Sequence, residues 1–202
     1  MSARERREQL VGVARSVFAE RGYEATSIEE IAERAGVSKP VVYQHFGGKE
    51  GLYAVVVDRE VRHLSDSISQ AFSARNPQDV AHAAAEAFLG YIQEREEGFQ
   101  ILIRDAPIGM TGGTFASVIS DVAARTEQLL VDEFSRRGFD AKTAPMYALM
   151  LVGAVALVGE WWLEHRDMPR EQVAAHVVNL MWNGLRGLSP APTPRRRRRI
   201  TP

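Results

Sequence analysis

The sequence predicts an all-α protein, and three observations support this prediction. Apolar residues recur at spacings of three and four along nearly the whole chain, which is the period of an amphipathic helix. Glycine and proline interrupt the pattern where one helix would end and the next begin. No stretch of useful length alternates apolar and polar residues as a strand would. We expect about nine helices, forming a three-helix N-terminal head with a helix-turn-helix and a larger C-terminal helical domain.

The first two helices are predicted from short apolar stripes that end at glycines. The first stripe consists of Leu10, Val13, Ala14, Val17 and Phe18, and the second of Ile28, Ile31, Ala32 and Ala35. Gly22 and Gly36 stand where these helices would stop. Ser27 and Glu30 form a potential capping box at the second start, and the same box can be drawn one residue earlier.

A third, very short helix is predicted for "SKPVVYQHF", residues 38–46. Only Gly36 and Val37 separate it from the second helix, and so tight a connection is typical of a helix-turn-helix over about residues 27–46. Val42 and Phe46 are four residues apart, so they share the face that packs inward. The residues left for the outer faces are Lys39, Pro40, Val41, Tyr43, Gln44 and His45.

Those outer residues favour contact with DNA. In the major groove an apolar side chain can read a thymine methyl group, and an amide can read adenine. Ser38 and Lys39 lie at the helix N-terminus, where a phosphate is favoured, and Lys49 begins the next helix. A purely structural subdomain stays open at this point, because the first 50 residues contain eight Lys/Arg and eight Asp/Glu and so form no basic patch.

Six further helices are predicted after Gly48, at about residues 49–72, 77–97, 98–106, 114–137, 141–165 and 169–188. A loop is predicted at 107–113, "PIGMTGG". The tail, residues 189–202, is rich in proline and arginine and is predicted to be disordered. The expected domains are therefore a head at 4–64, a body at 65–188 and the tail.

Composition and charge narrow the function. Cysteine is absent, which excludes disulfides, and no signal peptide is seen at the N-terminus. The apolar run at 144–158 is shorter than the ~20 residues that span a bilayer, so a buried helix and no membrane association are expected. The net charge is −1 although "RRRRR" adds five positive charges, so the rest of the chain is acidic. An acidic body argues against indiscriminate coating of nucleic acid.

The run "IEEIAERAGVSKPVVYQHFGGKEGLY", residues 28–53, preceded by "ARSVFAERGYEATS", closely resembles the N-terminal domain of TetR-type transcriptional regulators. The resemblance covers about residues 4–64. It implies a homodimeric, ligand-responsive repressor that binds a palindromic double-stranded operator, in the cytoplasm. It places base and phosphate contacts on Lys39, Pro40, Val41, Tyr43, Gln44, His45 and Lys49. It assigns capping or backbone-contact roles to Thr26, Ser27 and Ser38. Gly48 departs from the polar cap that many relatives carry there.

The resemblance also implies that the last two helices form the dimer interface. The residues expected there are Gly153, Ala156, Val173, Val177, Leu180, Met181 and Gly184. A cavity for an unknown apolar or amphipathic effector is expected among the middle helices, lined by Phe88, Tyr91, Phe99, Ile103, Met110, Phe115 and Ile119. Ordinary core packing remains the alternative reading for each residue of both sets.

Two other functions compete with regulation. The arginine run could make a nucleic-acid-binding protein without sequence preference, because phosphate contacts carry no base information. An enzyme is the less favoured alternative, since the five histidines form no metal motif and no catalytic constellation is visible. The sequence therefore predicts no catalytic residue, no metal site and no cofactor.

Overall fold

The computed structural model describes residues 1–74, 76–104, 115–189 and 192, and this part of the chain contains nine α-helices, a short 3-10 turn and no strand. The predicted all-α fold is confirmed. The predicted loop at 107–113 and nearly all of the predicted disordered tail, with its arginines, lie outside the described residues.

The head is built from α1 (Ala3–Ala25), α2 (Ile28–Ala35), α3 (Lys39–Phe46) and the beginning of α4 (Lys49–Ala71). Gly22 interrupts α1 with a φ of 79°, at the predicted position. Half of the predicted capping box is present, because the Ser27 hydroxyl accepts the Glu30 N–H at 3.1 Å. The Glu30 carboxylate pairs instead with Arg34 at 2.8 Å. Gly36 forms the turn with a φ of 64°, a conformation that favours glycine.

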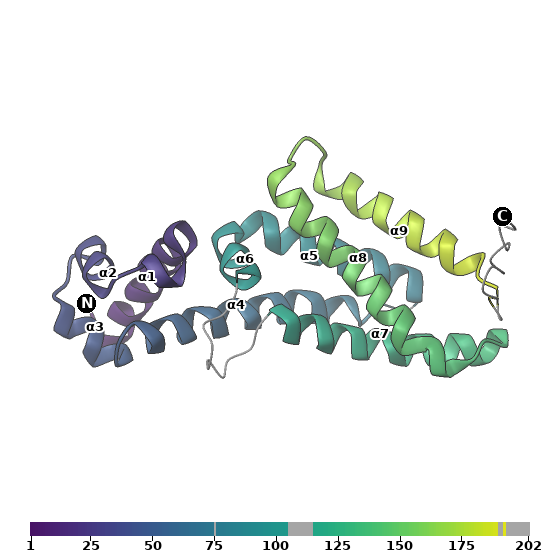
Figure 1. The fold of residues 1–202 in the computed structure, drawn as a ribbon, viewed down its shortest axis with the longest axis horizontal. Coiled ribbons are helices and arrows are strands. Elements are labelled where there is room, and N and C mark those ends of the chain that lie inside the picture. Colours follow the sequence, from purple (N-terminus) through teal and green to yellow (C-terminus); the bar gives the residue numbers. More distant parts are fainter. Residues whose placement is uncertain (75, 105–114, 190–191, 193–202) are drawn as a thin grey trace, which may run out of the picture.

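The body contains the rest of α4 together with α5 (Pro77–Glu94), α6 (Glu96–Ile103), α7 (Phe115–Arg137), α8 (Ala144–Glu164) and α9 (Arg170–Arg186). The predicted helix start at residue 141 is a 3-10 turn, Ala141–Thr143, and α8 begins after it with Pro145 in its first turn. As Figure 1 shows, α4 runs from the head along the body, and α6 lies between the two. The expected domain boundary after residue 64 falls inside α4, so head and body share this helix.

A buried carboxylate joins these helices. Glu60 on α4 is 2% exposed, and its oxygens accept from Arg95 Nε at 2.8 Å and Arg95 Nη2 at 2.6 Å. The Tyr91 hydroxyl donates to the same carboxylate at 3.1 Å, and Arg15 Nη1 of α1 lies 3.8 Å away. Burial alone would raise the pKa of Glu60, but the hydrogen bonds and charge of Arg95 outweigh it and hold the pKa below its usual value. The Glu60 cluster, meaning Glu60 with Arg95, Tyr91 and Arg15, therefore stabilises the fold above the unfolded-state pKa and loses this contribution as the pH falls through the folded-state pKa.

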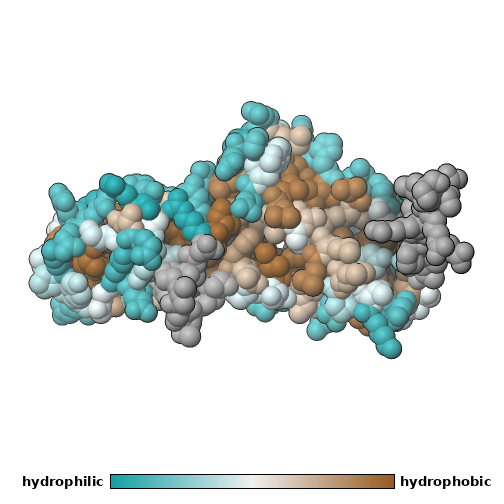
Figure 2. Space-filling view, viewed as in Figure 1, coloured by the Kyte–Doolittle hydropathy of each residue, from teal (hydrophilic) through white to brown (hydrophobic). Residues whose placement is uncertain are grey.

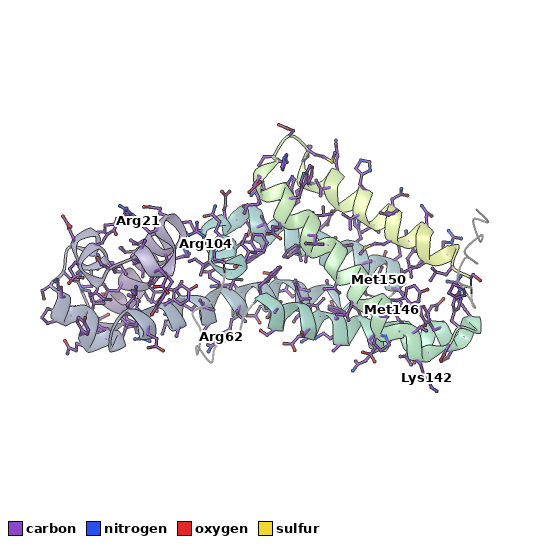
Figure 3. All side chains as sticks on the ribbon, viewed as in Figure 1. Arg21, Arg62, Arg104, Lys142, Met146 and Met150 are labelled. Atoms are coloured by element: carbon purple, nitrogen blue, oxygen red, sulfur yellow. The ribbon has the colours of Figure 1, made fainter. Side chains whose placement is uncertain are left out.

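Helix α6 is attached to α1 at both ends. Near its start, Glu97 accepts from Arg15 Nε and from the Ser16 hydroxyl, each at 3.1 Å. At its end, Arg104 donates to the Phe18 carbonyl at 3.1 Å, and Figure 3 shows Arg104 between head and body. Between these contacts α6 faces Glu60 with Gly98, where a Cβ atom would lie 2.2 Å from the Glu60 Oε2 atom.

The expectation that the apolar run at 144–158 is a buried helix was wrong. Helix α8 extends over 21 residues and exposes Leu157 (68%) and Trp161 (50%). Among the described residues one segment, Ala141–Glu164, has the length and composition of a bilayer-spanning helix, and 22% of its most apolar part is buried in the fold. Figure 2 shows apolar surface gathered over the body, whereas the head is mainly hydrophilic. An apolar helix face therefore lies open in the single chain.

We predict that Gly98→Ala lowers the free energy of unfolding by about 1–3 kcal/mol, because the added methyl group collides with the fixed Glu60 carboxylate. The matched control is Gly12→Ala in α1, where an added Cβ meets nothing within 4 Å. That variant should be neutral or more stable by up to about 1 kcal/mol. Urea unfolding of both variants measures the difference, and equal behaviour would contradict the close approach of α6 to α4.

Candidate nucleic-acid interface and internal cavity

Helix α3 has one buried face and one open face. Val42 is fully buried, whereas Tyr43 is 54% exposed and Gln44 and Pro40 are also exposed. The helix begins with a proline in its first turn, which fixes the backbone, and it ends at Gly47, whose φ is 75°. An exposed aromatic ring on so short a helix contributes little to the stability of the fold. This face is therefore available to bind a partner.

The N-terminal end of α3 presents polar groups. Ser38 occupies the N-cap position, yet its side chain makes no capping hydrogen bond, so the hydroxyl can turn toward another acceptor or donor. Lys39 forms an ion pair with the Glu29 carboxylate of α2, and both side chains are more than half exposed. Because exposed ion pairs contribute little stability, the lysine can leave this partner for a phosphate.

Three of the predicted contact residues are less open than expected. Thr26 is 3% exposed, and its hydroxyl donates to the Gly22 carbonyl at 2.7 Å, so a direct DNA contact by this side chain was wrong and only the helix-capping role fits. Val41 is half-buried and packs against the core rather than pointing fully outward. His45 is also half-buried, and its carbonyl accepts from Arg7 at 2.7 Å.

Lys49, for which the resemblance implies a phosphate contact, is half-buried. Its Nζ atom donates to the carbonyls of Tyr23 at 2.9 Å and Glu24 at 3.3 Å, and it lies 4.4 Å from the centre of the Tyr23 ring. Lys49 therefore satisfies carbonyls at the C-terminal end of α1 and ties that end to α4. A phosphate contact would have to share the ammonium group with these acceptors.

Sequence reasoning missed Gly51, which sets the angle between α3 and α4. A Cβ atom on Gly51 would lie 2.0 Å from the Phe46 carbonyl oxygen, so only glycine allows the two helices to approach this closely. The available signal was a glycine in the first turn of a predicted helix, where it is unfavourable by itself.

A cavity of about 540 Å³ lies between α4, α5, α7, α8 and α9. Three of the seven predicted lining residues do line it, namely Phe88, Phe115 and Ile119. Tyr91 instead donates to Glu60, and Phe99 is fully buried in the core on α6. Ile103 does not reach the cavity, and Met110 lies outside the described residues. The cavity is displaced toward the far end of α7, away from the predicted position.

The residues expected at the dimer interface divide into three groups. Val173 and Val177 are buried against their own chain, so an interface position was wrong for these two. Ala156 and Met181 line the cavity, and their place in an interface stays a prediction. Leu180 is 76% exposed, and added Cβ atoms on Gly153 and Gly184 would meet nothing within 4 Å. These last three lie on open surface of α8 and α9. In the described part of the chain, no group of three or more metal-ligating side chains comes together.

Comparison with known proteins assigns the family. Residues 10–56 match the model of bacterial regulatory proteins of the tetR family, and residues 77–184 match the tetracyclin repressor-like C-terminal domain. The two matches cover the head and most of the body, and the chain belongs to the TetR family of DNA-binding transcriptional regulators.

Relatives and solved structures agree with this assignment. The chain is 35% identical over 187 residues to the HTH-type transcriptional activator FasR of Mycolicibacterium smegmatis, covering 90% of this chain and 83% of that protein. A TetR-like transcriptional regulator from Rhodococcus sp. RHA1 superposes with a TM-score of 0.76 at 26% identity, covering 91% of this chain and 97% of the other. AibR, in complex with isovaleryl coenzyme A and operator DNA, has the same fold, with a TM-score of 0.69 at 22% identity over 87% of this chain and 97% of its own. FasR and the Rhodococcus protein are both named as transcriptional regulators or activators.

We predict that Lys49→Ala lowers the free energy of unfolding by about 1–2 kcal/mol, because it removes the hydrogen bonds to the α1 carbonyls and the contact with the Tyr23 ring. Tyr43→Ala is the matched control on the open face and should stay within about 0.5 kcal/mol of the unmodified protein. Thermal and urea unfolding provide the comparison. A neutral Lys49→Ala would show that the ammonium group does not hold α1.

Proposed function

We propose that the protein is a homodimeric repressor that occupies a near-palindromic operator and releases it when a small molecule fills the cavity. The observation that carries this proposal is the open face of α3, where Tyr43, Gln44 and Pro40 are exposed although the helix is anchored by the buried Val42. Regulators of this family bind operator DNA as dimers and respond to small-molecule ligands. The place of action is then the cytoplasm, where the DNA is.

In the proposed complex, α3 enters the major groove with its N-terminal turn leading. The Gln44 amide is suited to adenine, and the apolar surface of Tyr43 and Pro40 is suited to thymine methyl groups. Ser38 and Lys39 would bind phosphate at the helix N-terminus. Ser27 and Val41 would contact the DNA at the edge of the interface. His45 and Lys49 would contact it through the parts of their side chains that remain exposed to solvent.

The proposed dimer interface is the open apolar face of α8 and α9. Its members on α8 repeat at helical spacing and therefore form one stripe, and Leu180 of α9 continues it; they are Met146, Leu149, Met150, Leu157 and Trp161. Figure 3 places Met146 and Met150 along α8. Gly153 and Gly184 leave room for a second backbone to approach. Burying this stripe against its twofold copy removes a large apolar surface from water, which the single chain cannot do alone.

The cavity is the proposed effector site. The described lining residues are apolar over most of its length and charged at one end, and its volume of about 540 Å³ lies within the usual range for small-molecule sites. AibR, which shares the fold, is described with isovaleryl coenzyme A and operator DNA together, so this architecture can hold both partners. FasR is named as an activator, which in our proposal reflects where an operator lies relative to a promoter rather than a different way of binding.

We predict that two substitutions in the head act differently on DNA binding. Gln44→Ala should reduce discrimination at one base pair of each half-site by about 1–3 kcal/mol, because a base-specific contact is lost. Glu29→Gln should instead tighten binding to operator and random DNA by similar factors, because it frees Lys39 for phosphate. Competition binding against a randomised operator library measures both. If Glu29→Gln changed sequence preference, the assignment of Lys39 to phosphate would be wrong.

A second prediction concerns assembly. The double substitution Leu157→Glu and Leu180→Glu should convert the dimer to monomer at micromolar concentration, because it places charges in the proposed apolar interface. Operator affinity should fall with it, since each monomer reads only one half-site. Gln70→Glu, an exposed charge change on α4, is the control and should stay dimeric. Sedimentation velocity gives the result, and a double variant that remained a dimer would place the interface elsewhere.

A further inference from the structure

The cavity is a long channel with a direction. It follows α7 from Phe115 to Arg137, and its lining residues on this helix recur at spacings of three and four, so they form a single stripe. At 1.5 Å per residue this stripe is about 33 Å long. A volume of about 540 Å³ spread over that length describes a narrow channel, open to solvent where Leu129 (37% exposed) and Arg136 line it, rather than a closed round chamber.

Among the described residues, the charged members of the channel lining lie at one end. Glu133, Arg136 and Arg137 belong to the last turns of α7, and Arg186 is the last residue of α9. The three arginines outnumber the one carboxylate and are exposed, with the Arg136 side chain 70% exposed, so this end of the channel meets solvent and carries an excess of positive charge. Arg136 pairs with Glu133 at 2.7 Å, and Arg137 donates to the carbonyls of Leu185 at 3.4 Å and Arg186 at 3.2 Å. For the Arg186 side chain, the structure gives no carboxylate partner within the described residues.

In the middle and at the opposite end of the channel, the described lining residues offer almost no hydrogen bonds. Thr126 is the hydroxyl residue of the lining, and its hydroxyl already donates to the Val122 carbonyl at 2.8 Å. At the far end Phe88 and Phe115 stack with their ring centres 6.1 Å apart. Behind them lies Phe99 of α6, whose ring meets the Phe115 ring edge-on at 5.4 Å. A polar group placed here would lose its hydrogen bonds to water without replacement.

We infer that the effector is a single-chain amphipath with an anionic head group. Its apolar chain lies along α7 with the tip toward Phe115, and its head group is held by Arg136 and Arg186. This inference rests on the proposed function, because it assigns the effector of the same cavity. Fatty carboxylates and fatty acyl thioesters of a phosphate-bearing carrier share this chemistry. Polyaromatic, neutral and cationic molecules do not.

The orientation has a consequence for chain length. Only a chain long enough to reach Phe115 disturbs the ring contact with Phe99, and α6, which carries Phe99, is the helix attached to α1 by Glu97 and Arg104. Short chains would bind through the head group but leave α6 in place. Phe115 is therefore a specificity-determining residue for DNA release.

The test uses the full-length dimer and four probes with sixteen-carbon chains below their micellar concentrations: palmitate, palmitoyl coenzyme A, 1-hexadecanol and hexadecyltrimethylammonium. Calorimetry measures their binding, and tryptophan fluorescence of a Trp161→Phe, Trp162→Phe variant, in which only Trp182 of the channel lining remains, reports entry. We expect at least one anionic probe to bind about tenfold or more tightly than the alcohol, because charge-assisted hydrogen bonds are the stronger ones. Binding of palmitate alone identifies a carboxylate as the head group, and binding of palmitoyl coenzyme A alone identifies the phosphate-bearing carrier.

Variants at the two ends separate the parts of the inference. Arg136→Gln combined with Arg186→Gln should abolish the preference for the anionic probe, whereas Arg62→Gln, an exposed arginine of α4 away from the channel, should preserve it. Phe115→Ala should move the chain length that best releases operator DNA to longer chains. Leu129→Ala, at a lining position nearer the charged end, should leave that optimum unchanged.

The inference is overturned if 1-hexadecanol or the cationic probe binds as tightly as both anions, or if the double arginine variant keeps the preference. Operator binding without any probe is measured alongside. If the protein binds its operator but only neutral or cationic molecules release it, the proposed function stands and this inference is wrong. If the protein binds no operator, the proposed function is wrong, and the calorimetry still decides the head-group preference.

Discussion

The buried carboxylate of Glu60 is the constraint on which the arrangement of head and body depends. A carboxylate with 2% exposure must be matched by cations and hydrogen-bond donors, and these come from α1 and from the end of α5, where α6 begins. Removing one partner of such a buried pair leaves an uncompensated charge, at a cost of about 3–5 kcal/mol. The conformations in which α1, α4, α5 and α6 keep this contact are therefore strongly preferred over those in which the head swings freely.

This constraint places α6 between the DNA-binding head and the channel of the body. On one side α6 contacts α1 through Glu97 and Arg104, and on the other it carries Phe99, which meets Phe115 at the end of the channel. Because packed interiors transmit displacement rather than absorb it, a chain that moves Phe115 must move α6 or leave a strained contact. Helix α4 cannot move independently of α6, because the Glu60 carboxylate of α4 packs directly against Gly98 of α6.

Much of the fold could be predicted from the sequence, because helical period, glycine stops and proline starts are local signals. The open face of α3 was predictable for the same reason, since Val42 and Phe46 define the inward side of a helix only eight residues long. Hydrogen bonds to distant backbone carbonyls leave no local pattern, so the carbonyl partners of Lys49 and the burial of Thr26 could not be predicted. Helix α9 was misjudged because it has apolar residues on two sides, so spacing could not tell Val177, which faces the core, from Leu180, which faces outward.

The Glu60 cluster did leave a trace in the sequence. Glu60 stands at the helical spacing of Val56, Leu64 and Ile68, which are all buried, so a carboxylate interrupts an otherwise apolar stripe. Its partners lie 31 to 45 residues away along the chain, and no local pattern connects them. The channel was located only in part for the same reason, because its walls come from five helices whose packing is decided by such distant contacts.

The most direct test of the account is hydrogen exchange of the dimer with and without operator DNA. Helix α6 touches no part of the proposed DNA interface, yet the account predicts that operator binding slows exchange in Glu96–Ile103 and at the channel end of α7, because head and body are coupled in both directions. Slower exchange confined to α1, α2, α3 and the start of α4 would contradict it, since the head would then bind DNA without involving the body.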